Sequence, residues 1–188
     1  MSGTLTAAKD ARRQRMLDAA TELAEAGGYE AVQMRDVAAR AEVALGTLYR
    51  YFPSKEFLMA SVMVAEVQLL SGLLEVRPAR GDTPAERVLN VLERANRALL
   101  ARPEVSTAQI RALVSGNQDV AGAVQTVSDA MASLILSAMD VEPTEALVDV
   151  ADTLFDVWLA ALVGWIAGTT AADGVQAKLA RTVAQLLD

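Results

Sequence analysis

The sequence predicts an all-α fold, and three observations support that prediction. Of the 188 residues, 53% are apolar and 22% are charged, which is enough to bury one or two cores and too hydrophobic for a disordered chain. Only 11 glycines and 5 prolines interrupt the chain, and aromatic residues make up 4% of it. Because the apolar residues are mainly Ala, Leu and Val, the composition favours helices over sheets.

Three helices are expected before residue 54. The first runs from about Asp10 to Ala26, where apolar residues recur at helical spacing, and Gly27-Gly28 ends it. A short helix from Met34 to Ala41 follows, and the tight turn Glu42-Val43-Ala44 leads into a third helix. Pro53 closes the third helix because it lacks an amide donor and restricts the residue before it.

Six longer helices are expected after these, which makes about nine in total. The segment Thr83-Pro84-Ala85-Glu86 has the pattern of a helix start, with Thr as the cap, Pro at the first position and Glu at the third. The apolar spacing places the six helices at residues 54–75, 84–101, 104–114, 119–139, 143–167 and 174–187. We therefore expect a three-helix domain at 1–55 and a larger helical domain at 56–188.

The sequence lacks the residues of most catalytic and metal sites. It has no cysteine and no histidine, which removes thiolate chemistry, the commonest general base and the commonest metal ligand. No catalytic residue, metal or cofactor is expected. The N-terminus carries charges where a signal peptide needs an apolar run, and the longest uncharged run, Val157 to Ala172, has 16 residues, short of the roughly 20 that cross a bilayer. We expect a cytoplasmic protein without a membrane partner.

The net charge of −7 argues at first against a nucleic-acid partner, but the charge is unevenly distributed. Residues 1–60 hold eight basic and eight acidic side chains, so the whole excess of acid lies in the rest of the chain. Within the first part, Met1 to Leu17 and Gln33 to Lys55 are both locally positive. These two stretches are the candidates for contact with an anionic partner.

The stretch from Ala44 to Leu58, ALGTLYRYFPSKEFL, gathers basic and aromatic groups. A helical wheel places one set of side chains inward, namely Leu45, Leu48, Tyr49 and Phe52, with Tyr49 at the boundary. The opposite arc presents Gly46, Thr47, Arg50 and Tyr51. The predicted outward face is therefore small, polar and basic.

Such a face suits the major groove of DNA. Gly46 permits close approach, Thr47 can touch bases or phosphates, and Arg50 can bind guanine or phosphate. Lys55, just after Pro53, can hold the DNA backbone through its charge. An amphipathic core helix with a solvated outer face would show the same spacing, so the spacing alone leaves both interpretations open.

The run VQMRDVAARAEVALGTLYRYFPSKEFL resembles the helix-turn-helix of bacterial TetR-family transcriptional regulators. The resemblance covers the whole chain, strongly to about residue 60 and by architecture beyond it. It implies DNA contacts from seven positions: phosphate contacts from Tyr49 and Lys55, groove contacts from Gly46, Thr47, Arg50 and Tyr51, and a further contact from Arg35 on the first helix of the motif. It also implies binding to a double-stranded, pseudo-palindromic operator.

Three positions depart from the family pattern. Gln33 stands where a capping Thr is usual, Ala44 replaces a common Ser cap, and Glu42 occupies a turn position that usually holds Gly. A missing cap costs about 1 kcal/mol, and a non-Gly residue at positive φ is also unfavourable. We expect the motif to fold, but less stably in isolation.

A closer resemblance is to the actinobacterial, KstR-like repressors of sterol catabolism. The segments GGYEAVQMR, GTLYRYFPSK and DVWLAAL look like theirs, as does the order Arg-Pro then Arg-Ala-Leu around residues 102–113. This resemblance makes a repressor the default expectation, although the features above do not distinguish repression from activation.

The last two predicted helices are the candidates for a homodimer interface. Their apolar stripes could equally close the domain's own core, and part of each surely does. The resemblance implies a four-helix dimer bundle built from residues 146–166 and 175–187, as two-fold operator binding requires. The predicted interface residues are Leu147, Ala151, Leu154, Leu162, Trp165, Val175, Leu179, Val183 and Leu186.

The same resemblance implies a site for an effector in the second domain. The absence of Cys and His excludes most redox and metal sensing, so we expect an apolar organic molecule. The candidate lining residues are Leu70, Leu73, Leu92, Ile110, Val127, Leu134 and Trp158, with Asn96 and Arg111 as a polar end. An acyl or steroid coenzyme A thioester would suit apolar walls with arginines at the mouth.

The expected mechanism is an equilibrium between two dimer geometries. The helix from Ser54 to Glu75 belongs to both domains, so an effector that favours one tilt of it would lower operator affinity.

An enzyme is the first alternative, but Asp149, Asp152 and Asp156 read as solvated surface with no nucleophile beside them. A helical ligand-binding or interaction protein that has lost DNA binding is the second alternative. It predicts that DNA-contacting residues are missing from the third helix, whereas Thr47, Tyr49, Arg50 and Lys55 are all present.

Overall fold

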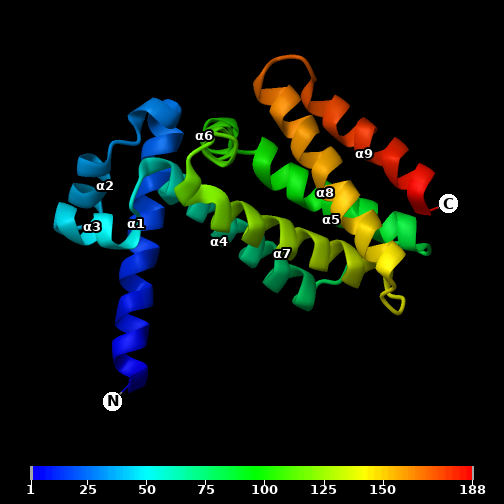
Figure 1. The fold of residues 1–188 in the computed structure, drawn as a ribbon, viewed down its shortest axis with the longest axis horizontal. Coiled ribbons are helices and arrows are strands. Elements are labelled where there is room, and N and C mark those ends of the chain that lie inside the picture. Colours follow the sequence, from blue (N-terminus) through cyan, green and yellow to red (C-terminus); the bar gives the residue numbers. More distant parts are fainter. Residues whose placement is uncertain (1, 188) are drawn as a thin grey trace. The chain divides into compact units, whose positions relative to one another are not determined.

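The computed structural model describes the backbone of residues 2–187 and the side chains of residues 7–187. This part of the chain contains helices and no β-strand, which confirms the all-α prediction. The α-helices are α1 (Ser2–Ala31), α2 (Met34–Arg40), α3 (Leu45–Tyr51), α4 (Lys55–Val76), α5 (Pro84–Leu100), α6 (Pro103–Leu113), α7 (Ala121–Met139), α8 (Glu145–Ile166) and α9 (Ala172–Leu187), with a 3₁₀ turn, η1 (Gln118–Val120), before α7 (Figure 1).

The helices form two compact units that differ from the predicted domains. Unit 1 contains residues 1–64 and 102–124, and unit 2 contains residues 65–101 and 125–188. The expectation was a division at residue 55, with every later helix in the second domain. Instead the boundary falls inside α4, and α6 joins the N-terminal helices because it packs along α1.

Unit 1 is organised around α1, against which both α2 and α6 pack. The helix begins earlier than predicted and continues through Gly27 and Gly28, which interrupt its helical backbone; Gly28 has φ 66°. Buried Met16, Ala20 and Ala24 form the inward face of α1. The short helix α2 packs on both α1 and α3, and Val37, Leu48 and Phe52 are buried in this unit.

The turn between α2 and α3 has the conformation that the sequence suggested. Glu42 has φ 55°, in the left-handed region where a side chain is unfavourable. Gln33 and Ala44 are the N-caps of α2 and α3, and neither provides a side-chain hydrogen bond. The two helices of the motif therefore owe their stability to packing in unit 1 rather than to caps.

Unit 2 packs α9 against α5 and α8. Thr83 and Glu86 form the predicted capping box at the start of α5, where Thr83 Oγ1 accepts from the Glu86 amide and the Glu86 carboxylate accepts from the Thr83 amide. Thr144 caps α8 by accepting from the Leu147 amide at 3.3 Å. These caps fix where each helix begins.

Two helices, Lys55–Val76 and the η1–α7 segment Gln118–Met139, are long and apolar enough to cross a membrane by length and composition alone. Part of each is buried inside the protein, as in the core helix of a folded domain.

Candidate nucleic-acid interface

The helix α3, which the sequence predicts to enter the DNA groove, is held by two fully buried side chains, Leu48 and Phe52. Gly46 and Arg50 are exposed, as predicted, and Thr47 and Tyr51 are half-buried. Two residues that the wheel placed inward are instead on the surface: Leu45 is 40% exposed and Tyr49 is 47% exposed. The reason is that α3 has only two turns and meets the core along a narrow line, so the helical wheel overestimated the width of its buried face.

Arg35 lies on α2 with its side chain 87% exposed, and its nearest acidic atom is Asp36 Oδ1 at 3.8 Å. An ion pair at that distance and exposure constrains the guanidinium weakly. Arg35, Gly46, Tyr49 and Arg50 are therefore all accessible residues of unit 1.

Lys55, at the first turn of α4, lies over the ring of Tyr29, with its Nζ 3.8 Å from the ring centroid. The guanidinium of Arg111, from α6, lies 4.6 Å from the same centroid. The Tyr29 hydroxyl donates to Glu56 Oε1 at 2.5 Å, and Arg111 Nη2 donates to Glu30 at 3.1 Å. We call Tyr29, Glu30, Lys55, Glu56 and Arg111 the Tyr29 cluster.

The cluster shifts the ionisation of three of its members. Burial, and next the hydrogen bond to Glu56, raise the pKa of the Tyr29 phenol above its ordinary value. The same hydrogen bond lowers the pKa of Glu56, and burial lowers the pKa of Lys55. The cluster ties α1, α4 and α6 together within unit 1 and fixes where the Lys55 side chain starts.

The placement of Arg111 corrects one expectation. Arg111 was predicted at the polar end of an effector pocket, but it is exposed and engaged with Tyr29 and Glu30 in unit 1. A helical wheel of α6 alone could not show this, because both partners lie about eighty residues earlier in the chain.

Unit 2 contains a cavity of ≈ 460 Å³ beside the end of α4 and the loop that follows it. Leu74, Val91, Leu134 and Ala138 supply apolar walls, and Arg87, Glu75 and Asp140 supply charge. Arg87 is held in place because it donates to the carbonyls of Ala138 at 2.9 Å and Met139 at 2.7 Å. Of the predicted effector residues, Leu134 alone is among those that line this cavity.

The other predicted effector residues lie elsewhere. Leu73 is 53% exposed and Leu70 is half-buried. Leu92, Ile110, Val127 and Trp158 are buried.

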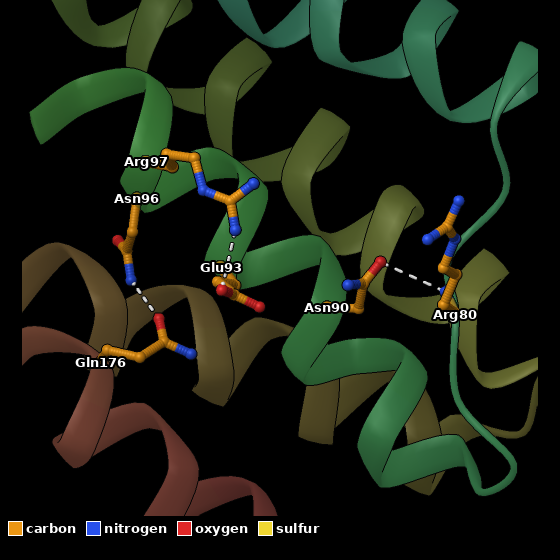
Figure 2. A network of polar contacts seen from close by, with 6 residues as sticks. All are labelled: Arg80, Asn90, Glu93, Asn96, Arg97 and Gln176. Carbon is orange, nitrogen blue, oxygen red and sulfur yellow. Dashed lines mark hydrogen bonds and ion pairs between the residues drawn. The ribbon is translucent and has the colours of Figure 1, made fainter. Parts of the chain in front are cut away.

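Asn96 is a buried polar link between three helices of unit 2. It accepts from Trp158 Nε1 at 2.6 Å. It also donates to Gln176 Oε1 at 2.7 Å (Figure 2). Figure 2 also shows the exposed Glu93–Arg97 pair on α5 and the contact in which Asn90 of α5 accepts from the backbone amide of Arg80 in the preceding loop. Asn96 and Trp158 therefore satisfy each other's polar groups inside the core.

Most of the predicted dimer residues are buried within the single chain. Six of them form part of the core of unit 2: Ala151, Leu154, Leu162, Val175, Leu179 and Val183. Leu147 and Trp165 are half-buried, and Leu186 is 39% exposed. The stripes on α8 and α9 thus belong to the core of unit 2, where α9 packs on both α8 and α5.

Sequence reasoning missed Tyr29 and Gln109. Tyr29 lies in the GGYEA join, whose aromatic residue gave no sign of its distant partners. Gln109 is fully buried on α6, and neither polar atom of its side chain has a hydrogen-bond partner within the described part of the chain. Its position on the core face of a helix, between Ala108 and Ile110, was the available signal.

Comparison with known proteins places both units in one family. Residues 16–62 match the model described as bacterial regulatory proteins, tetR family, and residues 81–186 match the tetracyclin repressor-like C-terminal domain. The chain is 41% identical over 177 residues to the transcriptional repressor KstR of Mycolicibacterium smegmatis, covering 94% of this chain and 87% of that protein. It is 42% identical over 181 residues to KstR of Rhodococcus jostii, covering 96% and 84%.

Two solved structures illustrate the similarity of the fold. A TetR transcriptional regulator from Rhodococcus sp. RHA1 superposes with a TM-score of 0.87 at 36% identity, covering 95% of this chain and 97% of that one. FadR of Thermus thermophilus, solved with lauroyl-CoA, shares the fold with a TM-score of 0.76 at 19% identity, covering 93% of each chain. The named relatives are transcriptional repressors, a class of regulators that are not enzymes. The chain therefore belongs to the TetR family of transcriptional regulators and is close to the KstR repressors.

Proposed function

We propose that this TetR-family repressor binds a pseudo-palindromic DNA operator as a homodimer and releases it when an apolar organic effector binds. The observation that carries the DNA-binding part is that α3 has one set of buried residues and another set of exposed ones. Leu48 and Phe52 anchor the helix in unit 1, while Gly46 and Arg50 remain exposed on a short helix that follows a tight turn. This is the arrangement that lets a helix-turn-helix enter the major groove.

The chemistry of the exposed residues supports base and phosphate contacts. The absence of a side chain at Gly46 leaves open space, since an added Cβ would meet nothing within 4 Å. Arg50 has a guanidinium that suits guanine or phosphate, and the half-exposed Tyr49 suits phosphate. Lys55 would contact the DNA backbone from its position over the Tyr29 ring.

Two-fold operators require two copies of the chain. We propose that the outward faces of α8 and α9 meet in the homodimer, rather than the buried stripes. Val148 on α8 and Leu186 on α9 are both 39% exposed, and they would supply apolar contacts on these faces. The acidic row Asp149, Asp152 and Asp156 shares the exposed side of α8 and would mark the polar rim of such an interface.

The cavity of unit 2 is the proposed effector site. Its apolar walls suit a hydrocarbon group, whereas its charged lining of one arginine and two carboxylates does not favour a polyanion inside it. Pro78 and Ala79 line the cavity, and the exposed Arg77 and Arg80 flank them. A coenzyme A thioester would place its acyl or steroid group in the cavity and its phosphates near these two arginines.

The helix α4 connects the two functions, because it starts in unit 1 with Lys55 and its end in unit 2 contributes Leu74 and Glu75 to the cavity. An effector that prefers one position of α4 would change the separation of the two α3 helices in the dimer. The coupling must be reciprocal, so the operator would weaken effector binding by the same factor.

The test uses an operator duplex selected from a random pool and three variants of the full chain. Arg50→Ala should weaken binding by tenfold or more and relax base preference, while Lys55→Ala should weaken binding to all sequences and lower the salt slope by about one unit. Arg97→Ala, on α5 of unit 2, is the control that should bind as the wild type does. If all three variants bound the operator with the same affinity, the proposed DNA-binding role of α3 would be refuted.

The effector is tested separately by titration with acyl and steroid coenzyme A thioesters, with free coenzyme A and the free acids as controls. Binding of a thioester should lower the affinity for the operator. The variant Arg77→Gln/Arg80→Gln should lose more affinity for the thioester than for the free acid. If no thioester binds, the coenzyme A class is wrong, while the DNA-binding proposal stands on the first test.

A further inference from the structure

Residues 7–15 of α1 carry a basic face that the proposed DNA contacts do not use. Lys9, Arg12 and Arg15 are exposed and Arg13 is half-buried, and Asp10 is the one acidic residue among residues 7–15. This segment precedes residue 16, where the match to the family's N-terminal domain begins. Its basic residues are therefore additional to the shared motif.

The basic residues continue the inward face of the helix beyond the core. At about 100° per residue, Lys9, Arg12 and Arg13 lie within about 60° of Met16, which is fully buried. Asp10 lies about 120° away from Met16, on the other side of α1. The face that is apolar where α1 packs thus becomes basic where α1 leaves the core.

Arg13 shows which part of unit 1 this face adjoins. Its guanidinium lies 5.5 Å from the centroid of the Phe52 ring, and Phe52 is the C-cap of α3. Lys9 is one further turn away from the core, about 6 Å along the axis at 1.5 Å per residue. Figure 1 shows α1 continuing past α2 and α3 toward its N-terminus.

The arrangement has a cost that a polyanion would remove. Lys9 and Arg13 are four residues apart, and Lys9 and Arg12 are three apart, so these like charges repel one another along the helix. Among the described residues, neither Lys9 nor Arg12 has an acidic partner within ion-pair distance. Both cations are thus available to a partner that lies beside α3.

We propose that Lys9 and Arg12 contact the phosphate backbone of the operator outside the bases that α3 reads. The inference rests on the proposed function, and it extends the DNA footprint to the flank of each half-site. An anionic membrane would also attract basic side chains, but a helix that lies on lipid needs large apolar residues on one face. Residues 7–15 offer only alanines as apolar side chains, which favours DNA.

The test compares the wild type with Lys9→Gln/Arg12→Gln on the selected operator, in a long duplex and in one trimmed to the bases contacted by α3. Each lost phosphate contact should lower the salt slope by about 0.9, so the slope falls by about 1.8 per bound chain. At about 0.1 M salt, each contact is worth roughly eightfold in affinity, and the difference should vanish toward 1 M. Trimming should weaken the wild type more than the variant.

The control variant is Arg94→Gln/Arg97→Gln on α5, which removes the same net charge from unit 2 and should leave operator binding unchanged. An unchanged salt slope in Lys9→Gln/Arg12→Gln, or a loss of affinity that is equal at all salt concentrations, would overturn the inference. So would binding to phosphatidylserine vesicles that the variant abolishes while its DNA binding stays normal. Failure of the wild type to bind any duplex would instead overturn the proposed function.

Discussion

Replacing Tyr29 by phenylalanine and by leucine separates two interactions that one side chain makes. Phenylalanine keeps the ring and removes only the hydroxyl that donates to Glu56 at 2.5 Å. Leucine also removes the ring on which Lys55 and Arg111 lie, at 3.8 and 4.6 Å from its centroid. The two variants therefore test the hydrogen bond and the cation–π contacts in turn.

The expected magnitudes follow from these contacts. A hydrogen bond to a charged group contributes about 1.5–3 kcal/mol, and because Tyr29 is only half-buried we expect about 1.5 kcal/mol for Tyr29→Phe. Each cation–π contact at a partly exposed site contributes about 0.5–1 kcal/mol, so Tyr29→Leu should cost a further 1–2 kcal/mol or so. Tyr49→Phe is the matched control, since Tyr49 is 47% exposed, and it should stay within about 0.5 kcal/mol of the wild type.

Urea unfolding of the full chain, followed by far-ultraviolet circular dichroism, measures these differences as shifts of the midpoint at constant slope. The expected order of stability is wild type and Tyr49→Phe, then Tyr29→Phe, then Tyr29→Leu. The reasoning is refuted if Tyr29→Phe unfolds at the same urea concentration as Tyr49→Phe, or if Tyr29→Leu is no less stable than Tyr29→Phe.

Three further predictions concern pH and single positions. Because the pKa of Tyr29 is raised, its stabilisation is complete below the ordinary phenol pKa near 10.0 and is lost as the pH rises above it; the stability gap between wild type and Tyr29→Phe should therefore be constant below about pH 10 and narrow progressively above it, and a constant gap throughout would contradict this. Glu42→Gly should raise the free energy of unfolding by about 0.5 kcal/mol because φ is 55°, and a lower urea midpoint would count against the strain. Gln109→Met should raise it by about 1–2 kcal/mol because both amide atoms lack partners, whereas a loss of stability would mean that the amide is satisfied.

Local features of the fold could be predicted from the sequence. Pro53, the Thr83 capping box and the interruption of α1 at Gly27-Gly28 each act through a few neighbouring residues, so a short stretch of sequence contains the cause. Glu42 is a further case, because the turn requires positive φ at that position whichever residue occupies it.

Contacts between distant residues could not be predicted. The Tyr29–Glu56 and Arg111–Glu30 contacts join residues 27 and 81 positions apart, and no periodicity reports such pairs. The stripes on α8 and α9 illustrate a second limit, because apolar spacing is the same whether a helix packs within its own chain or on another copy. That Leu154 and Leu179 are buried inside unit 2 could be learned only from the packed structure.

Selection of duplex DNA from a random pool by the full chain tests the central claim most directly. If α3 reads the major groove in a two-fold dimer, the selected sequences should share an inverted repeat with half-sites about one helical turn apart, and Arg50→Ala should lose that enrichment. A pool that remains as random after selection as before it would contradict the account, and it would leave unit 2 as a helical ligand-binding domain without a DNA partner.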